Sequence, residues 1–216
     1  DKSTEYINES TIQFDQTINT FRHPSKKFYW PKSGNLSFFS YFPNNLQSLA
    51  SDFKIDSSYN FTYEVTDGDV DIMLAKPQMN ITKNASPAGV PTVFQHKLTK
   101  IGVVARLKES YDPVTEAKFH INDIKFVNVY NSADFVGTPN TLGDAWVISD
   151  STDYTTINYM ANTDTVLRQF DTLYRAMRYD EMILMPQDFK NNTNPYKNSA
   201  DSAHLYVKYV IEMPGT

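Results

Sequence analysis

The sequence contains no cysteine, and this absence excludes several kinds of chemistry at once. Disulfide bonds, metal sites with thiolate ligands and thiol nucleophiles all require that residue. Long apolar runs are also missing, since no stretch approaches the roughly 20 consecutive apolar residues of a membrane-spanning helix. The chain starts at Asp1 without a methionine or a signal peptide, which is typical of a processed or truncated product. We therefore expect that targeting information has been removed.

Charge of one sign is not concentrated anywhere in the chain. Lys and Arg number 20 against 25 Asp and Glu, which gives a formal net charge of -5 without any block of like charges. The lack of a basic stripe argues against nucleic acid as a partner. Aromatic residues are abundant instead, with 14 Tyr and 14 Phe among 216 residues. This bias favours strands over helices.

Apolar residues at alternate positions predict strands in several segments. In "YNFTYEV", Tyr59, Phe61, Tyr63 and Val65 share one face, which we expect to be buried. Asp67-Gly68 then supplies a hairpin turn, because Gly tolerates a positive φ. The segment "NLSFFSYFP" predicts a strand that ends at Pro43, and "EMILMPQDF" predicts a short strand closed by Pro186.

Two predicted strands change phase along their length. In "VFQHKLTKIGVVARL", one face carries Phe94, His96 and Leu98, whereas the later apolar residues have the opposite phase: Ile101, Val103, Ala105 and Leu107. A slip of one residue near Thr99-Lys100 is what a β-bulge produces. In "KFHINDIKFVNVY", Phe119 and Ile121 precede Ile124 and Phe126 with the same kind of slip.

The last predicted strand is "AHLYVKYVIE". Its inward face carries Leu205, Val207, Tyr209 and Ile211, and its outward face carries His204, Tyr206, Lys208 and Glu212. With about 1.5–3 kcal/mol for each buried side chain, the inward face contributes roughly 6–12 kcal/mol before the entropy cost is subtracted.

Helical spacing occurs in only two segments. "NNLQSLASDF" predicts a two-turn helix from Leu46, Leu49, Ala50 and Phe53, and "DTVLRQFDTLYRAM" predicts an amphipathic helix or a long loop from Val166, Phe170, Leu173 and Met177. Residues 79–91 are polar and rich in turn-forming residues, as expected of a linker. We therefore expect an all-β chain of two tandem sandwiches, 1–86 and 87–216, with one or two short helices.

The histidines give no metal signature and no catalytic one. None of His23, His96, His120 and His204 falls in an HxH or HExxH spacing, and the chain has no GxSxG nucleophile elbow. His96 stands between residues that we expect to face the core, which favours a structural histidine. We therefore expect neither a metal nor a cofactor.

The sequence does not support a calcium site, and it gives little support for a glycosidase. "DGDVD", residues 67–71, fails as an EF-hand, because its sixth and twelfth positions hold Ile72 and Gln78 rather than Gly and Glu. A glycosidase would need two carboxylates that meet in space, and the sequence pairs none of them. A surface carbohydrate-binding module is the alternative function; its stacking platforms would be Trp30, Tyr41, Trp146 or Tyr154, although core packing also explains these rings.

Several motifs together resemble the fimbrillin-like (Mfa-like) proteins of anaerobic Gram-negative bacteria. The resemblance spans most of residues 12–212, and it also includes "INDIKFVNVYNSADF", "MILMPQDF" and "AHLYVKYVIE". The family shows a tryptophan before an aromatic strand, then a "DlmlA" segment, then a strand with a histidine. The corresponding residues are Trp30, Phe38, Phe39, Tyr41, Pro43, Asp71, Ala75, Phe94, His96, Leu98, Lys100 and Ile101, with Pro186 in a later motif.

The resemblance implies two transthyretin-like β-sandwich domains in a structural subunit or accessory protein of a cell-surface pilus. It implies no enzymatic activity, and it does not distinguish shaft, anchor and tip subunits. Such proteins are exported as lipoproteins to the outer membrane and are trimmed by a protease at an N-terminal strand. They assemble through β-strand exchange with other subunits, and their fimbriae support adhesion to host or bacterial surfaces. The resemblance also implies that His96 is a structural histidine on the first strand of the second domain.

The sequence departs from the family pattern at both ends. The part before Phe28 is short, and the chain stops at "EMPGT", before the strands that the family usually has near its C-terminus. We therefore expect an abbreviated first sandwich, and a second sandwich whose open edge is vacant or filled by residues outside these 216. A lipid anchor, the donor strand and the protease site would lie outside or at the ends of the chain.

Overall fold

A computed structural model describes residues 7, 10–66, 70–85, 89–106, 118–138, 146–148, 154–168, 175–177, 181–187 and 203–213. The elements of the first half are β1 (Gln13–Asp15), β2 (Thr20–Arg22), β3 (Leu36–Phe38), β4 (Tyr41–Phe42), α1 (Leu46–Leu49), β5 (Ser51–Ile55), β6 (Tyr59–Glu64), β7 (Met73–Ala75), β8 (Gln78–Ile81), the 3-10 turn η1 (Lys83–Ala85) and β9 (Phe94–His96). The remaining strands are β10 (Thr99–Ile101), β11 (Val104–Ala105), β12 (Lys118–Tyr130), β13 (Ser132–Val136), β14 (Trp146–Val147), β15 (Tyr154–Met160), β16 (Thr165–Arg168), β17 (Arg175–Ala176), β18 (Met182–Leu184) and β19 (His204–Glu212).

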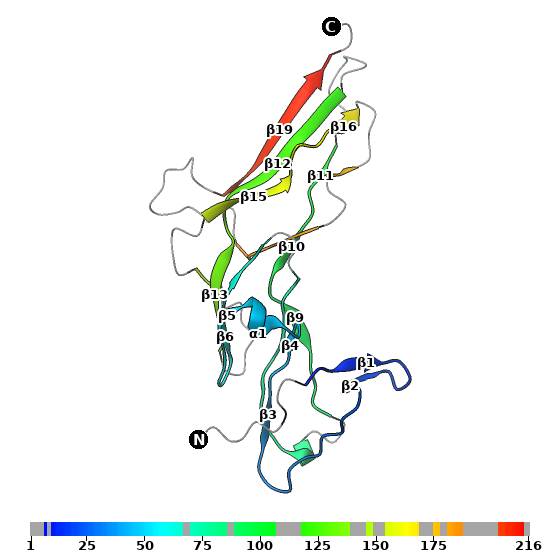
Figure 1. Ribbon diagram of the computed structural model, residues 1–216, viewed down its shortest axis with the longest axis vertical. Coiled ribbons are helices and arrows are strands. Elements are labelled where there is room, and N and C mark those ends of the chain that lie inside the picture. Colours follow the sequence, from blue (N-terminus) through cyan, green and yellow to red (C-terminus); the bar gives the residue numbers. More distant parts are fainter. Residues whose placement is uncertain are drawn as a thin grey trace.

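The chain is all-β, as the sequence predicts. The described residues contain one α-helical turn and one 3-10 turn beside the strands. The strands form an elongated molecule with β12 and β19 at one end and β3 and the β1–β2 hairpin at the other (Figure 1). Buried residues gather in two clusters along this length.

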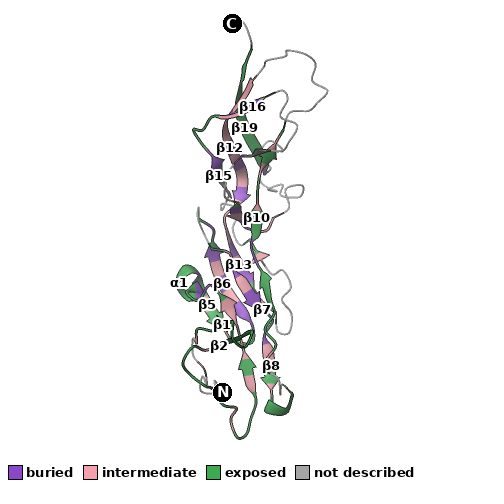
Figure 2. Cartoon of the chain, turned by 90° about the vertical axis from the view of Figure 1, so that its right-hand side faces the viewer, coloured by how far each residue is buried: buried purple, intermediate pink, exposed green. Residues whose placement is uncertain are grey.

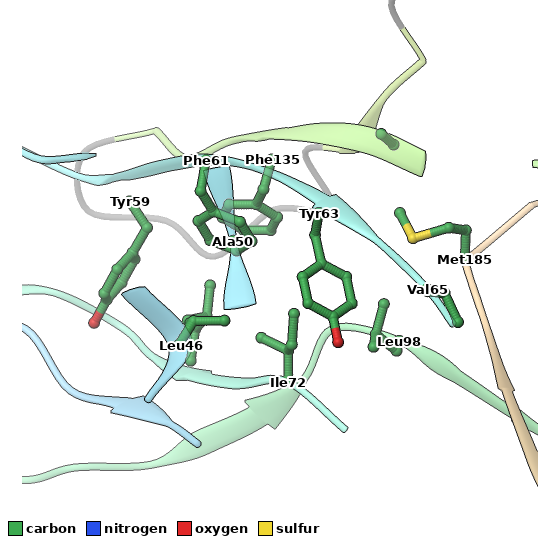
Figure 3. Packing of buried hydrophobic residues seen from close by; sticks show 12 residues of the cluster. Leu46, Ala50, Tyr59, Phe61, Tyr63, Val65, Ile72, Leu98, Phe135 and Met185 are labelled. Atoms are coloured by element: carbon green, nitrogen blue, oxygen red, sulfur yellow. The ribbon is translucent and has the colours of Figure 1, made fainter. Parts of the chain in front are cut away.

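The first cluster is built on a sheet with the order β14-β13-β6-β5. The predicted alternation of β6 is confirmed, because Tyr59, Phe61, Tyr63 and Val65 are all buried. The aromatic rings of Phe61 and Phe135 lie side by side in this cluster (Figure 3), with centroids 5.1 Å apart. The three-stranded sheet β4-β7-β9 contributes Leu74 from its middle strand.

The predicted two-turn helix at residues 44–53 is shorter in the structure. α1 ends at Leu49, and Ala50 is already extended, with ψ of 145°. Leu46 and Ala50 are buried, whereas Leu49 is exposed. Phe53 belongs to β5, because that strand pairs with β6 and this pairing replaces the second helical turn.

The chain passes from the first cluster to the second between residues 98 and 105. Leu98 packs in the first cluster, whereas Ile101, Val103 and Ala105 pack against the second. Thr99 and Lys100 between them are both exposed, so the apolar positions change phase here. The predicted β-bulge is wrong, because Phe94–His96, Thr99–Ile101 and Val104–Ala105 are separate strands that pair in three different sheets. Leu107 and the turn at Asp67-Gly68 lie outside the described residues.

The second cluster is built on β12, which pairs with β15 and β16 along one edge and with β19 along the other. The predicted slip in β12 is also confirmed: the register against β19 shifts between Ile121 and Asp123. Asn122 in this bulge donates its side-chain N–H to Thr163 O, 3.1 Å away, and so holds the turn between β15 and β16.

The helix predicted for residues 164–177 is wrong for Thr165–Arg168. This segment is strand β16, which pairs with Lys118–Ile121 of β12. Strand pairing with a distant segment overrides the local helical spacing here. Arg175 and Ala176 form β17, which pairs with β11, and Phe170 and Leu173 lie outside the described residues.

Strand pairing crosses the predicted boundary at residues 86 and 87. β6 pairs with β13 over five positions, and Gly137 N donates to Tyr59 O at 2.8 Å. A side chain at Gly137 would bring its Cβ within 2.7 Å of Tyr59 O, so this close approach requires glycine. The predicted linker 79–91 begins inside β8, which pairs with β3. The division into domains 1–86 and 87–216 stays a prediction.

Candidate functional site

β19 is an edge strand. It pairs antiparallel with β12 from His204 to Glu212, and no other strand in the described part of the chain pairs with its second edge. In Figure 1 it is the red arrow at the border of the sheet, beside the green arrow of β12. An edge of this kind presents backbone N–H and C=O groups that can pair with another strand.

The inner face of β19 continues the second cluster but is not covered. In the register, Leu205, Val207, Tyr209 and Ile211 lie opposite Phe126, Ile124, Ile121 and Phe119, so the predicted phase is confirmed. The predicted burial is wrong: these β19 side chains are 45%, 40%, 57% and 43% exposed. Figure 2 shows β19 exposed beside the more buried β12. The residues that cover β12 do not extend over its neighbour, since the second cluster contains none of these four residues.

The outer face of β19 is fastened by charged residues. Glu212 accepts a hydrogen bond from Lys118 Nζ at 2.9 Å, and its other oxygen lies 3.1 Å from His120 Nε2. Nδ1 of His120 lies 2.7 Å from Oδ1 of Asp164, in the turn before β16. These contacts join β12, β19 and that turn at one end of the sheet.

The same contacts shift the pKa values of His120 and Glu212. The hydrogen bond with Asp164, followed by the one with Glu212, raises the pKa of His120 above its usual value. The hydrogen bond from Lys118, followed by the one with His120, lowers the pKa of Glu212. Both shifts favour the charged forms, as expected for groups that face opposite charges.

The structure brings two of the family-motif residues together. Nδ1 of His96 contacts Oδ2 of Asp71, so the histidine motif and the "DIMLA" motif meet beside β7 and β9. The placement of His96 in the core is wrong: its side chain is 69% exposed, and Phe94 is exposed too. β9 pairs with β7 and is therefore an edge strand of the sheet β4-β7-β9.

The remaining motif residues have structural contacts. Pro43, Ala75 and Leu98 are buried, Ile101 packs against the second cluster, and Pro186 is half-buried. Trp30 packs edge-to-face on Phe38, and Phe39 packs in the same way on Tyr59. Lys100 contacts Glu181, and this contact raises the pKa of Lys100.

Replacing His96 with leucine is expected to change the free energy of unfolding by no more than about 1 kcal/mol, because even a charged pair contributes only about 0–1 kcal/mol at so exposed a position. Chemical denaturation checks this value. The melting temperature should also stay the same when zinc or a chelator is added. A stabilisation by metal that disappears in His96→Leu would contradict the structural role.

The aromatic residues considered for carbohydrate stacking pack against other rings. Trp146 lies edge-to-face on Phe61 and on Phe135, and its Nε1–H donates to Lys97 O at 2.7 Å. Tyr41 packs on Phe53, and Tyr154 lies 4.1 Å from Tyr130 between ring centroids. Core packing is confirmed for Trp146, which packs against the first cluster.

The described part of the chain contains neither a metal-binding group of side chains nor a membrane-spanning helix. His, Asp and Glu residues form no group of three or more there that could hold a metal ion. None of the helices in the same residues is long and apolar enough to cross a membrane.

The sequence missed both the exposure of β19 and the contacts of His120. One signal was present for the first, because apolar residues occupy both faces of β19: Leu205, Val207, Tyr209 and Ile211 on one, Tyr206 and Val210 on the other. No signal was present for the second, because Asp164 and Glu212 lie 44 and 92 residues from His120.

A family model described as fimbrillin-like matches residues 1–212. The chain belongs to the fimbrillin-like family. This membership supports a role as a structural fimbrial subunit at the cell surface that associates with other pilus subunits. Comparisons with curated proteins and with solved structures gave no match for this fimbrillin-like chain.

Proposed function

We propose that this fimbrillin-like chain joins its neighbours in the fimbria by β-strand complementation at β19. One observation carries the proposal: the inner face of β19 is in register with the second cluster, yet its four apolar side chains are 40–57% exposed. The outer edge of β19 pairs with no other strand among the described residues. A surface that is apolar and also has an open strand edge suits an added strand better than a globular ligand.

Covering this face would stabilise the assembly substantially. Full burial of an apolar side chain contributes about 1.5–3 kcal/mol, and roughly half of that remains to be gained at each half-exposed position. New backbone hydrogen bonds along the edge add to this gain. The matching partner is a strand of a neighbouring subunit with apolar residues at alternate positions, since those side chains would lie beside Val207 and Tyr209.

The remaining parts of the proposal concern the location and the motifs. We propose that the subunit is exported to the outer membrane surface, is held there through a lipid anchor or through its neighbours, and supports adhesion as part of the fimbria. We also propose that the family-motif residues are structural. The contact between Asp71 and His96 beside the β7–β9 pair and the packing of Leu98 in the first cluster support that role.

The experiment that tests strand complementation places one carboxylate on the inner face of β19. Fimbriae joined by strand complementation give ladders of polymers on gels run without boiling. A subunit with the carboxylate should fold but should not enter the ladder. If it enters the ladder as well as the unmodified subunit does, the proposed mechanism is wrong.

A further inference from the structure

His120 is placed so that both of its ring nitrogens face carboxylates. Nδ1 lies 2.7 Å from Asp164, and Nε2 lies 3.1 Å from Glu212. A neutral imidazole has one N–H and one lone pair, so it can donate to only one of these carboxylates. The imidazolium ion donates to both. The geometry therefore selects the protonated ring.

Each of the three residues belongs to a different part of the sheet. His120 lies in β12, Glu212 is the last residue of β19, and Asp164 precedes β16. The imidazolium thus links the end of the edge strand to the central strand and to the turn on its far side. The described charged side chains that face it are Asp164, Glu212 and, two residues away on β12, Lys118, which shares Glu212. In the register, Arg168 of β16 lies opposite Lys118.

We propose that protonated His120 is a clasp that fastens the C-terminal end of β19, and that this clasp opens when the imidazole loses its proton. As a regulator of assembly, the clasp rests on the proposed function, because β19 is there the strand that receives a partner. Mildly acidic surroundings keep the receiving strand in place along its whole length. Alkaline surroundings loosen its last residues.

The sign of the pH dependence follows from the two carboxylates. They raise the pKa of His120 above its usual value, so the folded chain holds this proton more tightly than the unfolded chain does. The stabilisation is complete below the pKa of an unfolded histidine, about 6.5, and is lost as the pH rises through the folded value. Glu212 stays charged at pH values near 5.5, because Lys118 and His120 lower its pKa.

The test measures amide hydrogen exchange of β19 in the free subunit between about pH 5.5 and 8.5. Each rate is divided by the rate of an unfolded peptide at the same pH, which gives a protection factor. Protection of residues 209–212 should fall on the order of 2- to 5-fold across this range, as expected for an exposed charge pair. Protection of residues 204–206 should stay nearly constant, because the clasp is at the opposite end of the strand.

Matched variants separate the clasp from other effects of pH. His120→Gln should show the low protection at every pH, and Asp164→Asn should keep the pH dependence with a lower midpoint. If either variant fails to fold, NMR titration of the His120 ring in the unmodified chain replaces it, with an expected pKa above about 6.5. The proposal is wrong if protection does not depend on pH, if the dependence survives in His120→Gln, or if the ring titrates at or below the usual value.

These measurements use the free subunit, so they do not depend on how subunits join. If amide exchange of β19 depends on pH and a subunit with a carboxylate on the inner face still forms ladders, the clasp is supported and strand complementation is contradicted. If amide exchange of β19 does not depend on pH and that subunit forms no ladders, strand complementation is supported and the clasp is contradicted.

Discussion

Replacing Phe135 with alanine is expected to lower the free energy of unfolding by about 3–5 kcal/mol, the usual cost of removing a buried phenylalanine. Phe135 is 1% exposed, its ring stacks on Phe61 with centroids 5.1 Å apart, and Trp146 packs on it edge-to-face at 5.1 Å. Such a loss is a large part of the roughly 5–15 kcal/mol that a native domain has. Denaturation with guanidinium measures it.

Val136 provides the matched control for this substitution. It is the next residue of β13 and is 46% exposed, so Val136→Ala should cost less than about 1 kcal/mol. A loss below about 1 kcal/mol for Phe135→Ala would contradict the packing of β13 into the first cluster. It would also contradict the placement of Phe135 and Trp146 in the core of the first half.

Replacing Tyr209 with aspartate is expected to abolish polymer ladders while the subunit stays folded. Tyr209 is 57% exposed in the single chain, so a carboxylate there is tolerated before assembly. Between its neighbours on β12 and the apolar side chains of a partner strand, the same carboxylate would lose water without gaining a counter-ion, at a cost of roughly 3–5 kcal/mol. This cost lowers the affinity ~100-fold or more. Gels without boiling and circular dichroism measure the two properties.

Tyr206→Asp is the control with the same change of side chain on the same strand. Tyr206 lies on the outer face, where the register places it opposite Lys125, and it is 43% exposed. A carboxylate at this position stays in water and faces a cation, so ladders should persist. Equal ladders from both variants, or equal loss in both, would contradict a site on the inner face.

The patterns within single strands could be predicted from the sequence. The alternation of Tyr59, Phe61 and Tyr63 gave the buried face of β6, and the slip at residue 122 corresponds to a real shift of register. These predictions succeed because the direction of successive side chains follows from local backbone geometry. The phase of β19 was also right for this reason.

The pairing between distant segments could not be predicted in this way. Nothing in residues 59–64 indicates that β13 lies beside them, and Thr165–Arg168 looked helical until its pairing with β12 was known. The predictions that His96 and the inner face of β19 are buried were wrong for the same reason. A strand with one apolar face shows which face is inward, but the layer that covers this face comes from elsewhere in the fold, or from another subunit.

The most direct test of the central claim is amide hydrogen exchange of residues 204–212 in the free subunit and in assembled fimbriae at the same pH. Strand complementation at β19 predicts strong additional protection in the fimbriae, because the second edge of the strand then pairs and its inward side chains gain apolar neighbours from the partner strand. Residues 118–121 and 124–126 of β12 serve as the internal control, since these residues already pair with neighbours on both edges. If β19 exchanges equally fast in both states, it is not where the subunits join.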